Sequence, residues 1–138
     1  MATPMPRFLT MLQIRSLHRR FTVPCAPLTQ QSMLESAVNA PVNPNHYEED
    51  HNVFRLAAIL AERIMKNHAF QDGNKRTALL AADMLLRVNG YCLQRVSFSE
   101  DVHTEGLAEA HVAVVTKKWT VEQLCNYYQQ HYIARTWD

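Results

Sequence analysis

The chain has 138 residues, which suffices for one domain that buries about two-thirds of the surface its unfolded form exposes. Its 14 basic and 13 acidic residues give a net charge of +1, which excludes general affinity for polyanions and confines any phosphate site to a local feature. Three cysteines without a CxxC spacing exclude a disulfide framework, and no apolar run has the length of a membrane span. We therefore expect one domain over residues 1–138, located in the cytoplasm, with neither nucleic acid nor a membrane as its partner.

The first expected element is a helix from about Met11 to Arg20, with Thr10 as its N-cap. An alternative for this segment is an organelle transit peptide, because no acidic residue precedes Leu34 while several arginines do. The helix is favoured. Its expected apolar contacts are Leu12, Ile14, Leu17 and Phe21.

A short helix is expected over Ser32–Val38, followed by an exposed loop at 39–49 that is rich in Pro and Asn. From Asp50 onward, apolar residues recur at steps of three and four, which is typical of a helix packed into a core. This pattern is interrupted between Asn67 and Gly73 and then resumes through Asn74–Val88. The sequence thus predicts a central helical hairpin.

Two further helices are expected after the hairpin, which ends at Asn89-Gly90. Ser97-x-x-Glu100 is a possible capping box for a helix that continues to about Thr116, and Thr120-x-x-Gln123 repeats the pattern before a helix at about Val121–Ile133. The predicted fold class is all-α, a compact bundle of about six helices around the central hairpin.

Chemically distinctive residues are concentrated between the two hairpin helices, where the sequence reads His68-Ala-Phe-Gln-Asp-Gly-Asn-Lys-Arg76. The N-terminus of the second helix offers N–H groups to an anion, and Gly73 allows close backbone approach. Asn74 could hydrogen-bond phosphate oxygens, while Lys75 and Arg76 add positive charge. Asp72 is suited to hold Mg²⁺, and His68 could accept the proton of an attacking hydroxyl.

A structural interpretation of the same residues remains open on chemistry alone. Asp-Gly-Asn also forms ordinary turns, Lys75 and Arg76 could be solvated, and His68 could bond a backbone carbonyl. Outside this segment, four histidines have no metal-ligand partner at a convincing spacing, so surface or capping roles are expected for His46, His51, His103 and His111.

The segment from His68 to Ala78 resembles the signature of the Fic/Doc family, in particular the Asp-Gly-Asn-Lys-Arg-Thr-Ala form of its Doc-like branch. Similarity extends to the first helix through Phe8-Leu-Thr10 and Ile14–His18, to Ser32–Val38, to Val88-Asn-Gly-Tyr91 and to Thr120–Tyr128. The resemblance covers about four-fifths of the chain and implies the all-α Fic/Doc fold.

The resemblance also implies roles for the motif, which spans residues 68–79. His68 would be the general base, and Phe70 would point inward and lock the loop. Asp72 would hold Mg²⁺ on the nucleotide phosphates. The expected phosphate-binding residues are Gly73, Asn74, Lys75 and Arg76. The co-substrate would be ATP, and the acceptor would be a Ser or Thr hydroxyl of a target protein.

The motif departs from the AMP-transferring members of the family at three positions. Ala69 stands where they have Pro, Lys75 where they have a second Gly, and Leu79 where they have a second Arg. Leu79 has no donor with which to grip a phosphate. These departures favour transfer of the γ-phosphate, with AMP transfer or a non-catalytic helical binding module as alternatives.

Family members often carry an inhibitory helix that reads Ser/Thr-x-x-x-Glu-Gly/Asn. The nearest segment here is Asp101-Val-His-Thr-Glu-Gly106, which lacks the hydroxyl residue at the required position. Control of the activity would therefore come from a separate, antitoxin-like partner.

Overall fold

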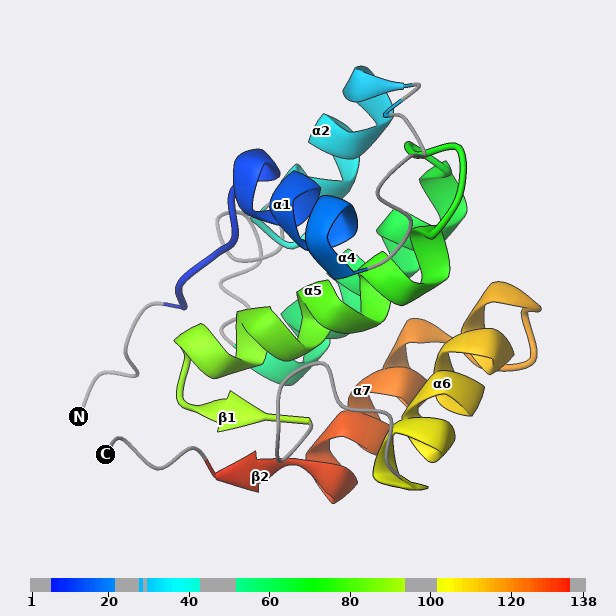
Figure 1. Ribbon diagram of the computed structural model, residues 1–138. Helices are drawn as coiled ribbons and strands as arrows, with labels where there is room; N and C mark the ends of the chain where they lie inside the picture. Colours follow the sequence, from blue (N-terminus) through cyan, green and yellow to red (C-terminus); the bar gives the residue numbers. More distant parts are fainter. Residues whose placement is uncertain (1–5, 22–27, 29, 43–51, 94–101, 135–138) are drawn as a thin grey trace.

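The computed structural model describes residues 6–21, 28, 30–42, 52–93 and 102–134 (Figure 1). Within these ranges it has six α-helices and one short antiparallel ladder, which confirms the predicted all-α class. The helices are α1 (Met11–Phe21), α2 (Gln31–Asn39), α4 (Val53–Asn67), α5 (Asn74–Val88), α6 (Val102–Val115) and α7 (Val121–His131). The ladder joins β1 (Tyr91–Cys92) to β2 (Ile133–Ala134).

Helices α4 and α5 form the predicted central hairpin. Asn52 caps α4, because its side-chain oxygen accepts from the N–H groups of Phe54 at 3.0 Å and Arg55 at 3.4 Å. Both helices bury several alanines beside larger apolar residues, and small side chains allow packed helices to approach closely. Fully buried members of this core include Ala57, Ala58, Leu60, Ala61, Ile64, Ala78, Ala81, Ala82, Leu85 and Leu86.

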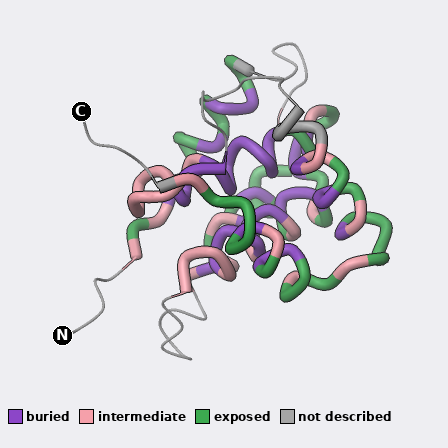
Figure 2. Tube along the Cα trace, turned by 90° about the horizontal axis from the view of Figure 1, so that it is seen from below, coloured by how far each residue is buried: buried purple, intermediate pink, exposed green. Residues whose placement is uncertain are grey.

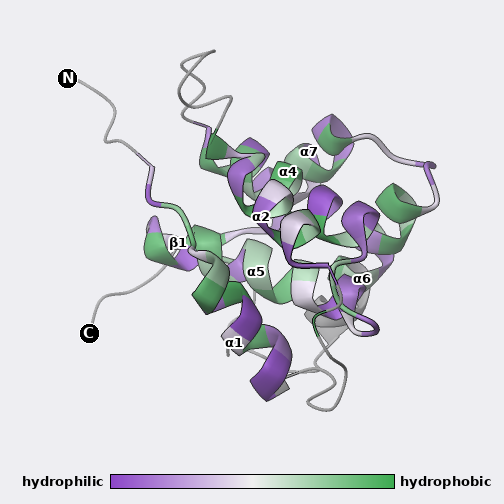
Figure 3. Cartoon of the chain, turned by 90° about the horizontal axis from the view of Figure 1, so that it is seen from above, coloured by the Kyte–Doolittle hydropathy of each residue, from purple (hydrophilic) through white to green (hydrophobic). Residues whose placement is uncertain are grey.

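The remaining helices cover the hairpin from two sides (Figure 1). Helix α1 packs against α5 and α2 against α4, while α6 and α7 lie on the other side. Buried segments run through the middle of the molecule, and exposed ones lie outside (Figure 2). Helix α1 alternates hydrophilic and hydrophobic segments, as expected of a helix with one packed face (Figure 3).

Side-chain caps define the predicted helix starts at Thr10 and Thr120. Thr10 and Gln13 exchange bonds of 3.2 and 2.8 Å, and Thr120 and Gln123 form the predicted capping box. The possible box at Ser97-x-x-Glu100 lies outside the described residues. None of the described helices combines the length and apolar character that a membrane crossing requires.

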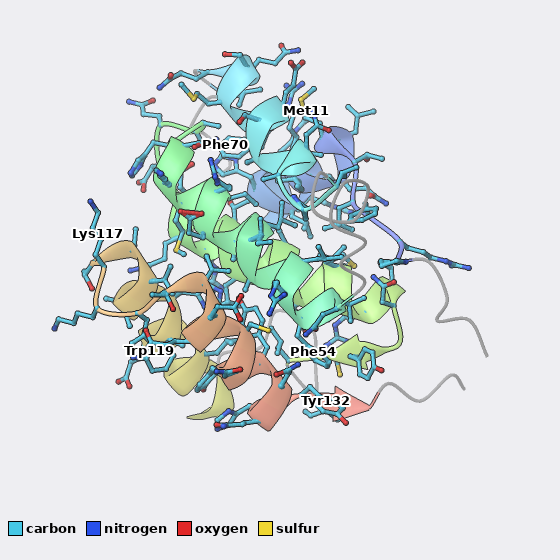
Figure 4. The ribbon with its side chains drawn as sticks, turned by 180° about the vertical axis from the view of Figure 1, so that it is seen from behind. Met11, Phe54, Phe70, Lys117, Trp119 and Tyr132 are labelled. Atoms are coloured by element: carbon cyan, nitrogen blue, oxygen red, sulfur yellow. The ribbon has the colours of Figure 1, made fainter. Side chains whose placement is uncertain are left out.

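The last helix ends two residues earlier than expected, because Ile133 belongs to β2. Tyr132 is already extended, with φ −70° and ψ 156°, and Ile133 pairs with Cys92 across the ladder. The aromatic rings of Tyr132, Tyr91 and Phe54 pack together beside the ladder, with centroids 4.9–5.2 Å apart. Figure 4 shows Phe54 and Tyr132 at this end of the molecule.

Two expectations for individual side chains are wrong. Leu12 is 72% exposed rather than packed, because the buried face of α1 is formed by Ile14, Leu17 and His18. His111 is not at the surface but fully buried, where it bonds the hydroxyl of Tyr128 at 2.7 Å. His46 and His51 lie outside the described residues, as does the side chain of His103.

Candidate active site

The polar segment that begins at His68 forms the turn between α4 and α5 and continues into the first turn of α5. His68 is the C-cap of α4 in the left-handed conformation, with φ 47° and ψ 49°, and it is exposed. Gly73 is the N-cap of α5 and is also left-handed, at φ 81°. The chain therefore reverses between two left-handed residues, and the intervening loop is short and polar at its surface.

Phe70 anchors this loop in the core. It is only 3% exposed, and its ring stacks on that of His18 with a centroid separation of 3.8 Å and an interplanar angle of 11°. A β-bridge joins Phe70 to Leu28, and the carbonyl of Ala69 accepts from Gln30 N–H at 3.1 Å. These contacts hold the Phe70 ring inside the core and fix the loop at this point.

Asn74 closes the loop from the first position of α5. Its side-chain oxygen accepts from Phe70 N–H at 3.1 Å, and its side-chain nitrogen donates to Phe70 C=O at 2.8 Å. We expected this amide to hydrogen-bond phosphate oxygens, but both of its ends bond the loop backbone and it is 8% exposed. What Asn74 offers a phosphate in this arrangement is its backbone N–H.

The start of α5 has the features of an anion site. The first helical bond runs from Thr77 N–H to Gly73 C=O at 2.9 Å, so the N–H groups of Asn74 and Lys75 precede the intrahelical ladder. The side chains of Lys75 and Arg76 are exposed in the same turn. One open pocket of about 520 Å³ is lined by Gly73, Asn74, Lys75 and Arg76, together with Met65, His68, Gln71, Asp72 and Val115.

Asp72 is the carboxylate of this pocket and is exposed. One of its oxygens accepts from Gly73 N–H at 2.7 Å, which fixes the side chain beside the start of α5. The described residues contain no group of three or more His, Cys, Asp or Glu side chains that could enclose a metal ion. A single exposed carboxylate instead fits Mg²⁺, which usually keeps several waters and shares the oxygens of a bound phosphate.

His18 supports the site from α1, although it lies outside the motif and its role is not evident from the sequence. Its Nε2 lies 2.8 Å from the backbone oxygen of Asp72 and must donate, since a carbonyl can only accept. The side chain is 3% exposed, although it lies 54 positions from Asp72 in the chain. Its burial could have been predicted from its position four residues after Ile14, which places it on the apolar face of an otherwise basic helix.

The geometry thus joins a histidine, a carboxylate, two cationic side chains and a helix N-terminus around one pocket. Comparison with protein families finds that the model of the Fic/DOC family matches residues 8–86, more than half of the chain. The matched region runs from the start of α1 almost to the end of α5 and includes the whole pocket loop. No curated protein matches the chain.

Proposed function

Because the chain belongs to the Fic/DOC family, whose members transfer part of a nucleoside triphosphate to proteins, we propose that it moves the γ-phosphate of ATP to a target protein. The acceptor is a Ser or Thr hydroxyl, and the branch is the Doc-like one. The observation that carries this choice is Leu79, which is 8% exposed within the core and does not line the pocket.

The position of Leu79 bears on the direction in which ATP lies. With an Arg there, two guanidinium groups could hold the outer phosphates at the start of α5 and expose the α-phosphate. Leu79 lacks such a contact, and a hydrogen bond to a charged group contributes about 1.5–3 kcal/mol. Among the described residues, the Lys and Arg side chains that line the pocket are Lys75 and Arg76, both in the first turn of α5. Their position supports binding of ATP with its γ-phosphate beside His68.

In this mechanism His68 acts as the general base. Its ring accepts the proton of the acceptor hydroxyl while the hydroxyl oxygen forms a bond to the γ-phosphorus. The bond between that phosphorus and the bridging oxygen breaks, and ADP leaves with the electron pair. Lys75, Arg76 and the N–H groups at the start of α5 stabilise the negative charge on the transferred group.

Asp72 would hold Mg²⁺ on the nucleotide, and the ion supplies charge neutralisation of the phosphates when bound. Asp72 is suited to this role because it is exposed at the pocket and held by the Gly73 N–H. Phe70, His18 and the side chain of Asn74 keep the loop in place and need not touch the nucleotide.

The test is to incubate the protein with lysate and Mg-ATP labelled at either the γ- or the α-phosphate. We expect γ-label on Ser or Thr of a target protein, and a loss of at least about a hundredfold in His68→Ala. Label from the α-phosphate alone would instead show AMP transfer. Absence of both labels would leave a non-catalytic binding module.

We further propose that activity is controlled by a separate inhibitor protein, since the sequence has no segment of the family's inhibitory pattern. The nearest segment, 101–106, lies largely outside the described side chains. An affinity pull-down from the native host should recover such a partner. A structure in which Glu105 pairs with Arg76 would show internal control instead.

A further inference from the structure

A second pocket lies beside the first, on the α6 side of His68. It measures about 290 Å³ and shares Met65, His68 and Val115 with the first pocket. Its remaining lining includes Glu62 and Lys66 from α4 and Lys117 from the turn after α6. His68 therefore stands where two pockets meet, and only one of them includes the start of α5.

Backbone strain marks the same pocket. Within the described residues, the non-glycine residues with positive φ are His68, at 47°, and Lys117, at 65°. Both line the second pocket. Left-handed backbone is unfavourable for residues with a Cβ, and such strained positions cluster at functional sites.

Lys117 occupies a position that usually belongs to glycine. Its N–H donates to Val114 C=O at 3.1 Å, and Lys118 N–H donates to Ala113 C=O at 2.9 Å. This pair of bonds is the Schellman ending of a helix, in which the left-handed residue is most often Gly. A lysine here gives up stability, and it adds a positive charge to the lining of the pocket. Figure 4 shows Lys117 on the turn after α6.

The charge of the pocket rim is positive. The side chains of Lys66 and Lys117 are exposed, and neither ammonium group forms a hydrogen bond or ion pair with any residue in the described part of the chain. The carboxylate of Glu62 lies 3.4 Å from Arg63 Nε, so its charge is partly compensated outside the pocket. Two lysines against one such carboxylate favour an anionic occupant.

From these observations we propose that the second pocket receives the acceptor segment of the target protein and selects one with Asp or Glu beside the acceptor Ser or Thr. The inference rests on the proposed function, which assigns the triphosphate to the start of α5. A nucleoside carries no negative charge for Lys66 and Lys117 to bind. The remaining participant is the acceptor, which must reach His68 from a side that the phosphates leave open.

The first test is a binding titration with synthetic Ser peptides that carry Asp, Ala or Lys on both sides of the serine. We expect the Asp peptide to bind the wild-type protein best, and Lys66→Ala and Lys117→Ala each to weaken it about two- to fivefold. Lys117→Glu should reverse the order and favour the Lys peptide. The matched control is Lys118→Glu, which changes the same charge at the neighbouring exposed residue outside the pocket.

The titration contains no nucleotide and needs no turnover, so failure of the proposed transfer chemistry would not affect it. Equal behaviour of the Asp and Lys peptides toward the wild type, including no binding of either, would overturn the inference. The same holds if Lys118→Glu abolishes the preference as fully as Lys117→Glu.

The second test uses the strained backbone. Lys117→Gly should raise the melting temperature by about 3–5 °C, since glycine adopts this conformation freely, and should weaken the Asp peptide as Lys117→Ala does. A stabilised variant with unchanged peptide binding would show that Lys117 serves only to end α6.

Discussion

At the scale of single residues, Asp72 and Arg76 share one pocket but offer a nucleotide different contacts. The Asp72 carboxylate and a phosphate are both negatively charged and repel each other, so Asp72 can bind ATP only through a cation. The guanidinium of Arg76, in contrast, can donate hydrogen bonds directly to phosphate oxygens. Asp72→Ala should therefore weaken ATP binding with Mg²⁺ present and have no weakening effect in EDTA. Arg76→Ala should weaken it about tenfold under both conditions.

Isothermal titration calorimetry with and without Mg²⁺ measures this difference, with Lys118→Ala as a control for general loss of positive charge. Wild-type affinity in Arg76→Ala would remove the phosphate site from the start of α5. A loss in Asp72→Ala that persists in EDTA would mean that the carboxylate supports the loop through Gly73 rather than a metal ion.

His18 makes two separable contacts with the pocket loop, the hydrogen bond to Asp72 C=O and the stack on Phe70. His18→Gln keeps a donor near the Nε2 position, while His18→Phe keeps an aromatic ring without a donor. If the bond positions Asp72, the Phe variant should need several-fold more Mg²⁺ for half-maximal transfer, and the Gln variant should stay close to wild type.

A merely structural His18 gives the opposite pattern. The Phe variant would then have the same Mg²⁺ requirement as the wild type. The Gln variant, which loses the stack on Phe70, would show the larger drop in melting temperature, because the stack would then be the contact that stabilises the loop. Measuring both quantities for both variants separates the two roles.

At the scale of elements, the turn between α4 and α5 depends on the amide of Asn74, which satisfies both backbone groups of buried Phe70. Asn74→Ala removes both partners, and each buried polar group left without a bond costs about 1–3 kcal/mol. We expect the free energy of unfolding to fall by at least this amount in urea denaturation, together with a loss of transfer activity.

Asn74→Asp serves as the comparison, because it keeps the acceptor for Phe70 N–H but places a carboxylate oxygen against Phe70 C=O. It should be at least as destabilised as Asn74→Ala. If both variants unfold at the wild-type urea concentration while activity falls, Asn74 instead contacts the phosphate, as its position in the motif suggested.

Local sequence patterns predicted the helices well, because amphipathic spacing and caps such as Thr10 and Thr120 depend on residues three or four positions apart. Contacts between distant residues left no such pattern. Asp83 lies inside an apolar helix, yet it is buried, and besides its local pair with Arg87 at 2.8 Å it accepts from Leu93 N–H, beyond the end of the helix, at 2.7 Å. Its role becomes evident only when the chain after α5 folds back.

The same limit applies to the candidate site. The residue types from His68 to Arg76 predict a phosphate site, and the structure brings His68, Asp72, Lys75 and Arg76 to the lining of one pocket. A motif could not show that the amide of Asn74 faces the loop or that His18 lies beneath it, because each depends on how the backbone turns at Gly73 and where α1 packs.

At the scale of the whole molecule, the hairpin of α4 and α5 is held between α1 and α2 on one side and α6 and α7 on the other. The first side supports the pocket loop through His18 of α1, which stacks on Phe70 and donates to Asp72 C=O. The second side contributes Val115 to the pocket and joins its two helices through His111 and Tyr128. The stability of this second side therefore affects the shape of the site.

The buried pair of His111 and Tyr128 makes that stability depend on pH. His111 Nδ1 donates to Leu107 C=O at 2.8 Å, so Nε2 accepts the Tyr128 hydroxyl and the ring is neutral. Burial lowers the pKa of His111 from 6.5 to about 4, against a smaller opposing effect of the bond to Leu107, and burial raises the pKa of Tyr128 well above 10.

Since the folded His111 titrates near 4 and the unfolded one near 6.5, the unfolded chain binds an extra proton between these values. Stability from this group is complete above about pH 6.5 and falls as the pH drops toward 4, by about 3 kcal/mol in all. His111→Gln removes the titration and keeps a donor and an acceptor. Urea denaturation across this range should give a steeper loss for the wild type than for His111→Gln, and parallel curves would assign the acid sensitivity to other groups.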